Sequence, residues 1–390
     1  MGSRSCYDDL EKWRAGHTAH IVIDIRVTQG GYPGIGRATE GLTRALLADP
    51  GSHRFSLLYQ KAKPLSPALI ADVCPPHRLL PIAASLRDPR DQLETPLRLS
   101  QVRADLYHAT YYATALKPGV HTVLTLYDLI PERYPRYWSA PEALIIRRWT
   151  RSAAARADHI LVPSEATAAD LRAHFRIEDT RLTVAPLAMD DWLQAGESER
   201  PEGLGDRPFL LCVCTNKPHK NLLRLVRAYH RFVSRLSSPP DLVLAGGWDP
   251  RYPEARDAAA RLFPDEGSAG PTVRFIHGPS DNELRWLYHH ALAFVFPSEY
   301  EGFGLPVLEA MCAGLPVAAS HTPAVAEVAG DAALLFDPLG EDAIADALFR
   351  IVTDTTAAAH LATAGKRRAA QFTWKTPAAR TVAAYRAALC

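Results

Sequence analysis

Short apolar runs alternate with amphipathic segments along most of the chain, and this alternation is the strongest constraint on its fold. Continuous apolar strands separated by helices indicate parallel sheets that helices cover on both faces. The sequence therefore predicts the α/β class. The runs predicted as strands are 20–25, 105–110, 121–130, 159–164, 181–187, 208–215, 241–246, 272–278, 291–298, 316–320 and 333–337.

The segment that follows residue 220 illustrates the helical pattern between these runs. Its apolar residues recur at alternating spacings of four and three, which places them on one face of a helix. These residues are Leu222, Val226, Tyr229, Val233 and Leu236.

The alternation breaks once, at residues 189–208, which are polar, rich in Pro and Gly, and without a period. A chain of 390 residues exceeds the usual size of one domain. We therefore predict a first domain over 1–190, a linker over 191–207 and a second domain over 208–372. A last helix within 373–390 could pack on either domain.

Composition excludes some functions. Hydrophobic residues make up 47% and charged residues 22% of the chain, which is ordinary for a globular protein and argues against global disorder. The formal net charge is +1, so no basic field indicates a nucleic acid partner.

Location is inferred from the cysteines and from the N-terminus. Six scattered cysteines without a CxxC pair favour a reducing compartment. The first twenty residues lack the apolar stretch of a signal peptide, and no segment approaches the roughly 18 apolar residues of a membrane span. We expect a cytoplasmic protein. Residues 133–158 are basic and partly apolar, so they form either a solvated helix face or a peripheral contact with the inner face of a membrane.

One stretch, "FPSEYEGFGLPVLEAM" at 296–311, joins a predicted strand to a predicted helix through a glycine-containing loop. Ligands of parallel α/β sheets bind beyond the carboxyl ends of the strands, where such loops lie. Gly302 and Gly304 let the backbone approach a ligand closely. The amides of Phe303, Gly304 and Leu305 can donate to phosphate oxygens at the helix N-terminus.

Two glutamates, Glu301 and Glu309, bracket this loop. Helix capping and a solvated face would explain either one. Alternatively, the carboxylates accept hydrogen bonds from sugar hydroxyls, with Glu309 on a ribose and Glu301 on a second sugar.

The longer stretch "PSEYEGFGLPVLEAMCAGLPV" resembles the signature of glycosyltransferase family four, also called the group one transferases, in which seven residues separate two glutamates. The resemblance implies the GT-B fold: two doubly wound Rossmann-like domains that face each other across a cleft, with the C-terminal helix returning to the first domain. It further implies transfer from a nucleotide-diphosphate sugar with retention of configuration, without a metal and without another cofactor.

The resemblance also assigns residues in "CTNKPHKNL" to the donor diphosphate. Lysines at a strand-to-helix loop are commonly solvated surface residues, but the family's lysine in "KN" binds the diphosphate. We therefore expect Lys220 to act in catalysis together with Glu301, with Lys217 and His219 as helpers. The loop after the strand 272–278 is expected to contact the base through backbone groups near Ile276 and His277.

In the first domain, the glycine-rich stretch "GGYPGIGR" follows the first strand. It lacks the full dinucleotide fingerprint, so a nicotinamide site is not expected. The resemblance places Gly31, Gly34 and Gly36 near the donor phosphates. Arg37 is either a phosphate contact or an exposed residue at the start of a helix.

A first-domain histidine lies near the donor sugar in the family. Related sequences have His-Asp-Leu where this chain has Tyr127, Asp128 and Leu129. We predict His108 and Asp128 as catalytic candidates, the alternative for His108 being a buried structural role.

The predicted activity is transfer of a hexose, with mannose from GDP-mannose as the first choice, to a saccharide or lipid-linked saccharide. This choice follows a resemblance to bacterial mannosyltransferases of surface polysaccharide assembly. Alternatives are a UDP-sugar transferase acting on a small molecule, a nucleotide-sugar epimerase, a phosphorylase, or an inactive binding module. The inactive module is disfavoured because Glu301, Glu309 and Lys220 are all present.

Overall fold

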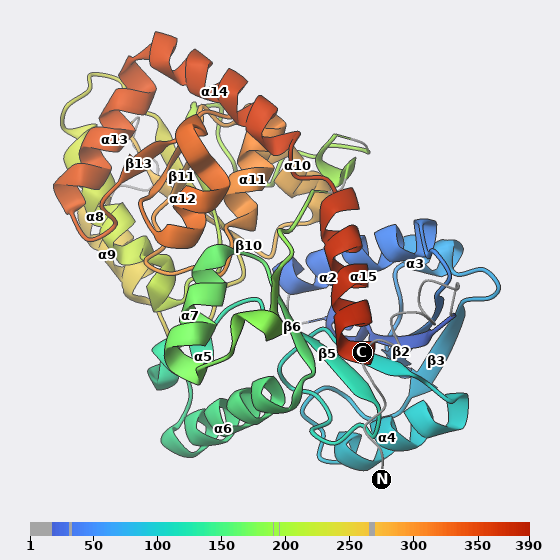
Figure 1. Ribbon diagram of the computed structural model, residues 1–390. Helices are drawn as coiled ribbons and strands as arrows, with labels where there is room; N and C mark the ends of the chain where they lie inside the picture. The colour runs from blue at the N-terminus through green and yellow to red at the C-terminus, as the bar shows by residue number, and fades with distance from the viewer. Residues whose placement is uncertain (1–17, 31–32, 190, 195, 265–269) are drawn as a thin grey trace. The chain divides into compact units, whose positions relative to one another are not determined.

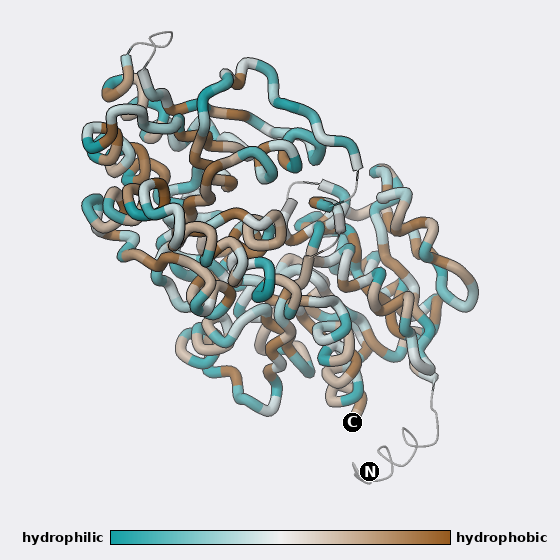
Figure 2. Tube along the Cα trace, turned by 90° about the horizontal axis from the view of Figure 1, so that it is seen from above, coloured by the Kyte–Doolittle hydropathy of each residue, from teal (hydrophilic) through white to brown (hydrophobic). Residues whose placement is uncertain are grey.

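The protein is described by a computed structural model over residues 18–30, 33–189, 191–194, 196–264 and 270–390. The chain divides into two compact units, one of residues 1–188 with 373–390 and one of residues 189–372. Each unit is built on one parallel sheet flanked by helices (Figure 1). Hydrophobic segments lie mainly inside the units and hydrophilic segments at the outer turns (Figure 2). The predicted α/β class is confirmed.

In the first unit, the described residues form a seven-stranded parallel sheet in the order β3-β2-β1-β4-β5-β6-β7. Strands β2 and β3 therefore follow one another on one side of β1, and strands β4 to β7 follow one another on its other side. The strands are β1 (His20–Asp24), β2 (Arg54–Gln60), β3 (Arg78–Ile82), β4 (Leu106–Ala109), β5 (His121–Thr125), β6 (His159–Val162) and β7 (Leu182–Val184).

Helices cover both faces of this sheet. Alternate residues of a strand point to opposite faces, so Val22 packs beneath α4, α6 and α7, while Ile21 and Ile23 pack beneath α2, α3 and α15. The helical segments of the unit are η1 (Arg26–Gln29), α2 (Pro33–Ala48), α3 (Pro67–Asp72), α4 (Asp91–Val102), α5 (Ile130–Arg133), η2 (Pro135–Tyr137), α6 (Ala140–Arg156), α7 (Glu165–Phe175), η3 (Asp179–Arg181) and α15 (Lys375–Leu389).

The C-terminal helix α15 packs on β5, β6, β7 and α2, all in the first unit. Its Tyr385 is fully buried and contributes to the same core as Ile21. This packing confirms the predicted return of the last helix to the first domain.

In the second unit, the described residues form a six-stranded parallel sheet in the order β10-β9-β8-β11-β12-β13. The direction of building reverses between β8 and β11. The strands are β8 (Phe209–Val213), β9 (Asp241–Gly246), β10 (Val273–His277), β11 (Ala293–Phe296), β12 (Val317–Ser320) and β13 (Leu334–Phe336).

The helices of the second unit bury apolar stripes against its sheet. In α8, the predicted face is confirmed: Val226 and Tyr229 are fully buried, although Leu236 lies beyond the end of the helix. The helical segments are η4 (Asp191–Leu193), η5 (Pro218–Lys220), α8 (Leu222–Val233), α9 (Glu254–Leu262), α10 (Asp281–His290), α11 (Leu305–Ala313), α12 (Pro323–Ala329), η6 (Gly330–Ala332), α13 (Glu341–Thr353) and α14 (Thr355–Ala369).

Each of the runs predicted as strands contains a strand of the structure, but β2 and β3 were not predicted. In β2, polar residues interrupt the apolar run. In β3, Pro81 reads as a strand breaker, and it is accommodated because β3 is the edge strand of its sheet.

The segment predicted as the linker lies on the second unit. η4 packs on α11, and the Arg285 guanidinium of α10 donates to the carbonyl oxygens of Trp192 (2.8 Å from Nε) and Glu197. Among the described residues, no helix is long and apolar enough to cross a membrane.

Candidate active site

The reversal of strand order in the second unit brings two loops together at the carboxyl ends of β8 and β11. Such a switch point is where open parallel α/β sheets bind ligands. The loop after β8 carries Lys217, His219 and Lys220, and the loop after β11 carries Glu301. The topology thus places these two sequence motifs at one edge of the sheet.

Lys220 and Glu301 form an ion pair across these loops. Lys220 Nζ lies 2.6 Å from Glu301 Oε1, and the two side chains are 17% and 12% exposed. The ammonium group also lies 5.8 Å from the centre of the Phe296 ring. A limited exposure strengthens the electrostatic interaction while leaving both groups open to a ligand. The structure therefore brings together Lys220 and Glu301, two of the four residues that the sequence predicted to act in catalysis.

The second glutamate, Glu309, occupies a buried position in α11. Its side chain points into the unit, is 4% exposed, and accepts a hydrogen bond of 2.7 Å from the Tyr288 hydroxyl to Oε2. Its place beyond the first turn, with a specific donor from α10, distinguishes it from a solvated residue at a helix start. The predicted contact with a ribose remains a prediction.

The loop between the glutamates contains a backbone conformation that favours glycine. Gly304 is the N-cap of α11 and has φ 121°, which residues other than glycine rarely adopt. Phe303 is buried and packs edge-on against Phe372 with ring centroids 5.9 Å apart. Leu305 is the third residue, after Phe303 and Gly304, whose amide we predicted to bind phosphate at the N-terminus of α11, and Gly302 precedes these three.

A set of polar contacts that sequence reasoning missed holds the two loops together. Asn221, which has φ 62°, donates through Nδ2 to the carbonyl oxygens of Pro297 (3.1 Å) and Pro338 (2.7 Å). Arg224 forms an ion pair of 2.7 Å with Glu299, whose amide donates to the His219 carbonyl oxygen at 2.8 Å. The "KN" pair was a signal for Asn221, but no spacing in the sequence indicated Arg224 or Tyr288.

His219 does not reach the surface of the site. Its side chain is 1% exposed, and burial together with the charges of Lys220 and Lys217 lowers its pKa well below the ordinary value. The predicted role of His219 as a helper in diphosphate binding remains a prediction. Lys217 is half-buried at the start of η5 and stays a candidate.

The residues predicted to contact the nucleotide base lie at the carboxyl edge of the same sheet, at the end of its outermost strand β10. Ile276 and His277 end β10, two strands from β8, and pair in register with Ala245 and Gly246. Gly246 has φ 142°, and a Cβ there would lie 2.1 Å from the Cys214 carbonyl oxygen. The backbone at Cys214 therefore leaves no room for a side chain at residue 246.

In the first unit, the His108 side chain lies inside the fold. The side chain is fully buried, with Nδ1 2.8 Å from the Tyr385 hydroxyl and Nε2 2.8 Å from Thr125 Oγ1. Burial lowers its pKa to about 3, so the ring is neutral at pH 7. His108 thus ties β4 to α15 in this structure, as the structural alternative expects. Its predicted role in catalysis remains a prediction.

The other first-unit candidates surround the ends of β1 and β5. Asp128 Oδ1 accepts the Ile130 amide at 2.8 Å and so orders the start of α5. Tyr127 bonds to Thr39 Oγ1 at 3.0 Å, and burial raises its pKa to about 12.

The predicted glycine loop is partly helical. Gly34 and Gly36 lie in the first turn of α2, and the half-buried Arg37 follows that turn. Gly31 lies outside the described residues. Among the residues that are described, no group of three or more His, Cys, Asp or Glu side chains could hold a metal ion.

Two family models match the chain in sequence order. The model for glycosyltransferase family 4 matches residues 32–192, and the model for group 1 glycosyl transferases matches residues 196–368. The first covers much of the first unit, and the second covers almost all of the second unit.

Curated relatives are similar at the level of sequence. The chain is 28% identical over 272 residues to the O-antigen chain mannosyltransferase B of Escherichia coli, covering 68% of this chain and 70% of the relative. It is 30% identical over 280 residues to the MMP alpha-(1->4)-mannosyltransferase of Mycolicibacterium hassiacum, covering 69% of this chain and 64% of that relative. It is 25% identical to the serotype-specific mannosyltransferase WbdA of Escherichia coli over 91% of this chain, which spans only 46% of that relative.

Solved structures share the fold. Sucrose-phosphate synthase from Thermosynechococcus elongatus superimposes with a TM-score of 0.69 at 22% identity, covering 94% of this chain and 98% of that one. Anabaena Alr3699/HepE, in complex with UDP and glucose, gives a TM-score of 0.67 at 19% identity with the same coverage. Since both domain models of one family match in order and the fold agrees, the chain belongs to glycosyltransferase family four and is a glycosyltransferase with the GT-B fold.

Proposed function

We propose that this protein transfers mannose from GDP-mannose to a saccharide or lipid-linked saccharide, with retention of configuration and without a metal ion. The observation that carries the proposal is the Lys220–Glu301 ion pair at the switch point of the second unit. The choice of mannose is supported by the relatives, three of which are mannosyltransferases.

In the proposed reaction, Lys220 and the N-terminus of α11 stabilise the negative charge that develops on the leaving diphosphate. The bond between the anomeric carbon and the phosphate oxygen breaks, and the acceptor hydroxyl oxygen bonds to that carbon on the same face. The acceptor's proton passes to the leaving phosphate oxygen. Glu301 holds the transferred sugar and orients the Lys220 ammonium, and Glu309 binds the ribose hydroxyls.

A panel of GDP-mannose, UDP-glucose and UDP-galactose, each supplied with alkyl glycoside acceptors, tests this function. We expect transfer from GDP-mannose, an α-linked product by NMR, and no loss of rate with EDTA. Transfer from UDP-sugars alone would refute the proposed donor, a β-linked product would refute retention, and loss of transfer with EDTA would refute the metal-free mechanism.

The ion pair is tested by substitution. Lys220→Ala should lower kcat by at least about 100-fold, because it removes the positive charge beside the leaving group. Arg231→Ala is the matched control, since Arg231 belongs to an exposed ion-pair cluster with Glu341 and Asp342 in the same unit. Its kcat should stay within about twofold of the wild type because exposed pairs contribute little. Equal rates for the two variants would contradict the role of Lys220.

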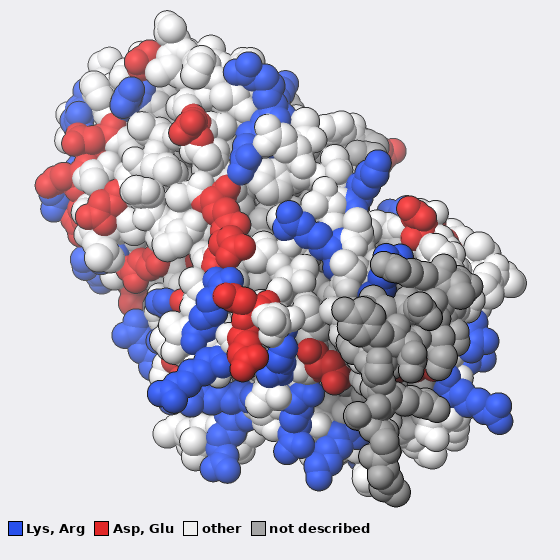
Figure 3. Space-filling model, in the orientation of Figure 1, with Lys and Arg blue, Asp and Glu red and all other residues white. Residues whose placement is uncertain are grey.

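We also propose a peripheral contact between α6 and an anionic lipid surface. Leu144 and Ile145 are 57% and 58% exposed on this helix, and Lys and Arg side chains gather over it in the lower part of Figure 3. Exposed apolar residues beside positive charges suit the interface of an anionic bilayer. Part of this charge is neutralised, because Glu132 pairs with Arg147 and Arg151.

Cosedimentation with vesicles tests the contact. Binding should require phosphatidylglycerol in phosphatidylcholine vesicles, should fall with added salt, and should weaken in the double variant Leu144→Ser, Ile145→Ser. A double variant that binds as well as the wild type would exclude α6 as the contact.

A further inference from the structure

Two helices of the first unit expose large apolar side chains to solvent. On α4, Leu93 and Leu97 are 79% and 57% exposed, and on α6, Leu144 and Ile145 are 57% and 58% exposed. Leu93 and Leu97 are four residues apart, so they lie on one face of α4. Single exposed apolar residues are ordinary, whereas a gathered group marks an interaction surface. The described part of the chain has three other exposed large hydrophobic residues, Ile70, Leu292 and Leu339.

The helices α4 and α6 are neighbours on one face of the sheet. Leu99 of α4 and Ala153 of α6 belong to the same core cluster. Gln92 Nε2 and Trp149 Nε1 donate to one carbonyl oxygen, that of Thr114, at 3.2 and 2.9 Å. Both helices lie along the lower side of the first unit in Figure 1. Their exposed apolar residues therefore form one surface. This α4–α6 surface consists of Leu93, Leu97, Leu144 and Ile145.

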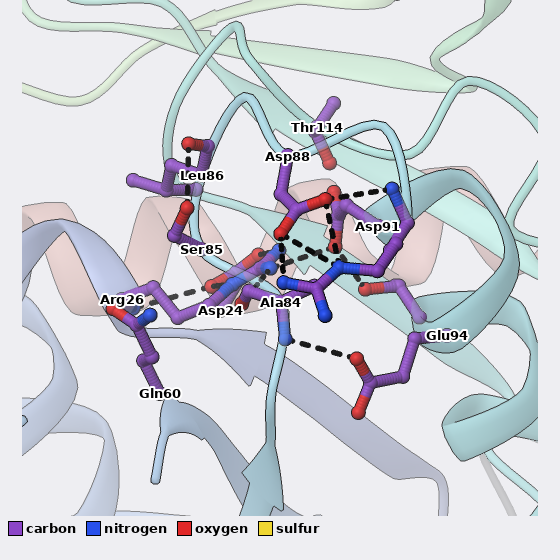
Figure 4. A network of polar contacts seen from close by, with 12 residues as sticks. Asp24, Arg26, Gln60, Ala84, Ser85, Leu86, Asp88, Asp91, Glu94 and Thr114 are labelled. Atoms are coloured by element: carbon purple, nitrogen blue, oxygen red, sulfur yellow. Dashed lines mark hydrogen bonds and ion pairs between the residues drawn. The ribbon is translucent and has the colours of Figure 1, made fainter. Parts of the chain in front are cut away.

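A buried ionic network fixes α4 to the unit (Figure 4). Asp91, the first residue of α4, pairs with Arg26 at 2.6 Å, and Arg26 also pairs with Asp24 at the end of β1 at 2.5 Å. These three side chains are at most 3% exposed. Glu94 accepts the amide of Ala84 at 2.9 Å. Because the inner face of α4 is held in this way, its two exposed leucines stay turned toward solvent.

The α4–α6 surface adjoins the carboxyl edge of the first unit's sheet. α4 follows β3, and α6 follows β5 after the short segments α5 and η2. Thr114, to which both helices donate, lies in the loop after β4. All four residues of the surface lie in the first two turns of their helices. The surface is therefore next to the edge at which parallel α/β sheets bind ligands.

Charge around this surface favours an anionic partner. α4 and α6 together carry five arginines and three acidic residues. The acidic side chains are engaged within the fold: Asp91 and Glu94 as described above, and Glu142 in the capping box of α6. Arg148 of α6 and Lys117, in the loop that carries Thr114, are exposed, and neither forms an ion pair with another described residue. Exposed apolar side chains beside such cations suit an anionic bilayer.

We propose that the α4–α6 surface docks on an anionic lipid bilayer and that the acceptor is a lipid-linked saccharide presented by this bilayer. The apolar side chains enter the boundary between headgroups and acyl chains, and the exposed cations contact lipid phosphates. Docking beside the carboxyl edge brings the saccharide of such an acceptor to that edge. The inference rests on the proposed function, because it chooses between soluble and lipid-linked acceptors, and it adds α4 to the contact proposed for α6.

One sugar supplied in two physical forms tests this inference. The probes are methyl α-mannoside in solution and a dialkylglycerol α-mannoside in vesicles of phosphatidylcholine and phosphatidylglycerol, each with GDP-mannose. The double variant Leu93→Gln, Leu97→Gln should lower the rate on the vesicle-borne acceptor by at least about tenfold, since two apolar side chains no longer enter the bilayer. Its rate on methyl α-mannoside should stay within about twofold of the wild type, because exposed side chains contribute little to the fold.

The matched control is the double variant Ile70→Gln, Leu292→Gln. It changes two residues that are 47% and 46% exposed and lie outside the α4–α6 surface, on α3 and in the loop between α10 and β11. Both of its rates should equal those of the wild type. A loss on the vesicle-borne acceptor in the α4 variant and not in this control supports the inference. Wild-type rates in the α4 variant, or equal losses in both variants, overturn it.

Further outcomes separate this inference from the proposed function. Transfer to methyl α-mannoside alone leaves the function standing and overturns the inference. If the wild type transfers to neither probe from any donor, the proposed function fails, and cosedimentation with the same vesicles decides the docking by itself. Binding that requires phosphatidylglycerol and weakens in the α4 variant supports docking, and no binding by the wild type overturns it. A dimeric wild type with a monomeric α4 variant, neither of which binds vesicles, would assign the surface to a second copy of the chain and overturn the inference.

Discussion

Single side chains around the proposed donor site of the second unit have roles that can be separated by measurement. Tyr288 is fully buried, and its hydroxyl is a hydrogen-bond donor to the carboxylate of Glu309. A hydrogen bond to a charged group contributes about 1.5–3 kcal/mol, so its loss should loosen the orientation of this carboxylate. Tyr288 is thus a positioning residue for the proposed ribose contact.

Tyr288→Phe should raise the KM for GDP-mannose by about tenfold while changing kcat by less than about threefold. Tyr229→Phe is the control, because Tyr229 is equally buried in this unit but donates to the Pro240 carbonyl oxygen at 2.7 Å. Both variants should lose similar stability, and only the first should lose donor affinity. If their donor KM values agree, Glu309 does not depend on Tyr288.

The sequence predicted some of these residues and not others for a physical reason. Glu301, Glu309 and Lys220 follow strands and belong to a recognisable motif, so type and spacing were sufficient. Burial is not visible in a motif, so the sequence did not show that the side chains of His108 and His219 lie inside the fold. Asn221 and Pro297 are distant in sequence, and only the strand order brings them together.

At the scale of elements, the start of α15 lies unusually close to α2, one of the elements on which it packs. A Cβ at Gly41 of α2 would lie 2.3 Å from the Trp374 ring, which directly precedes α15. The helix can therefore pack at this distance only because residue 41 has no side chain. At Gly34, in the same helix, no atom of the described residues other than its neighbours in the chain and helix lies within 4 Å of such a Cβ.

Gly41→Ala should lower the free energy of unfolding by about 1–3 kcal/mol, because the methyl group displaces Trp374. Gly34→Ala, the control, should leave it unchanged or raise it by up to about 1 kcal/mol, since alanine favours helix. Urea unfolding followed by circular dichroism measures both. A Gly41→Ala variant as stable as the wild type would show that α15 can shift without cost.

The strands show how far element prediction reaches. Buried parallel strands such as β8 and β11 are continuous apolar runs, so composition located them. At the edge of the first sheet, β3 is buried less evenly and tolerates Pro81, so its pattern resembles that of a loop. Strand order could not be derived from the pattern, since it depends on packing between distant segments.

At the scale of the whole molecule, buried histidines are concentrated in the first unit. In the first unit, burial is the main cause of a lowered pKa at five histidines: His20, His53, His77, His108 and His159. Among the described residues of the second unit, burial lowers the pKa of one histidine, His219. These rings are neutral when folded and can protonate near pH 6.5 when unfolded. The unfolded state therefore binds more protons below that pH.

It follows that the stability contributed by these groups is complete above about pH 6.5 and is lost as the pH falls below it. For the fully buried His108, the loss approaches about 1.4 kcal/mol per pH unit between pH 6 and its folded pKa of about 3. The raised pKa of Asp91 opposes this trend, because burial favours its protonated form. We expect calorimetry between pH 7.5 and 5 to show two transitions, with that of the first unit moving further.

His159→Asn should reduce this pH dependence, because it removes a buried ring whose pKa is lowered mainly by burial. Hydrogen exchange at each pH, corrected for intrinsic rates, assigns the transitions to the units. A second unit that proves the more acid-sensitive would contradict the expectation.

The path of the chain also fixes the order in which the protein can be completed during translation. Residues 373–390 belong to the first unit but are synthesised after the entire second unit. Most of the second unit is therefore synthesised while β5, β6 and β7 still lack the helix that covers them. Until the last residues emerge, the nascent chain displays an apolar strip of its first unit, which is the kind of surface that chaperones hold.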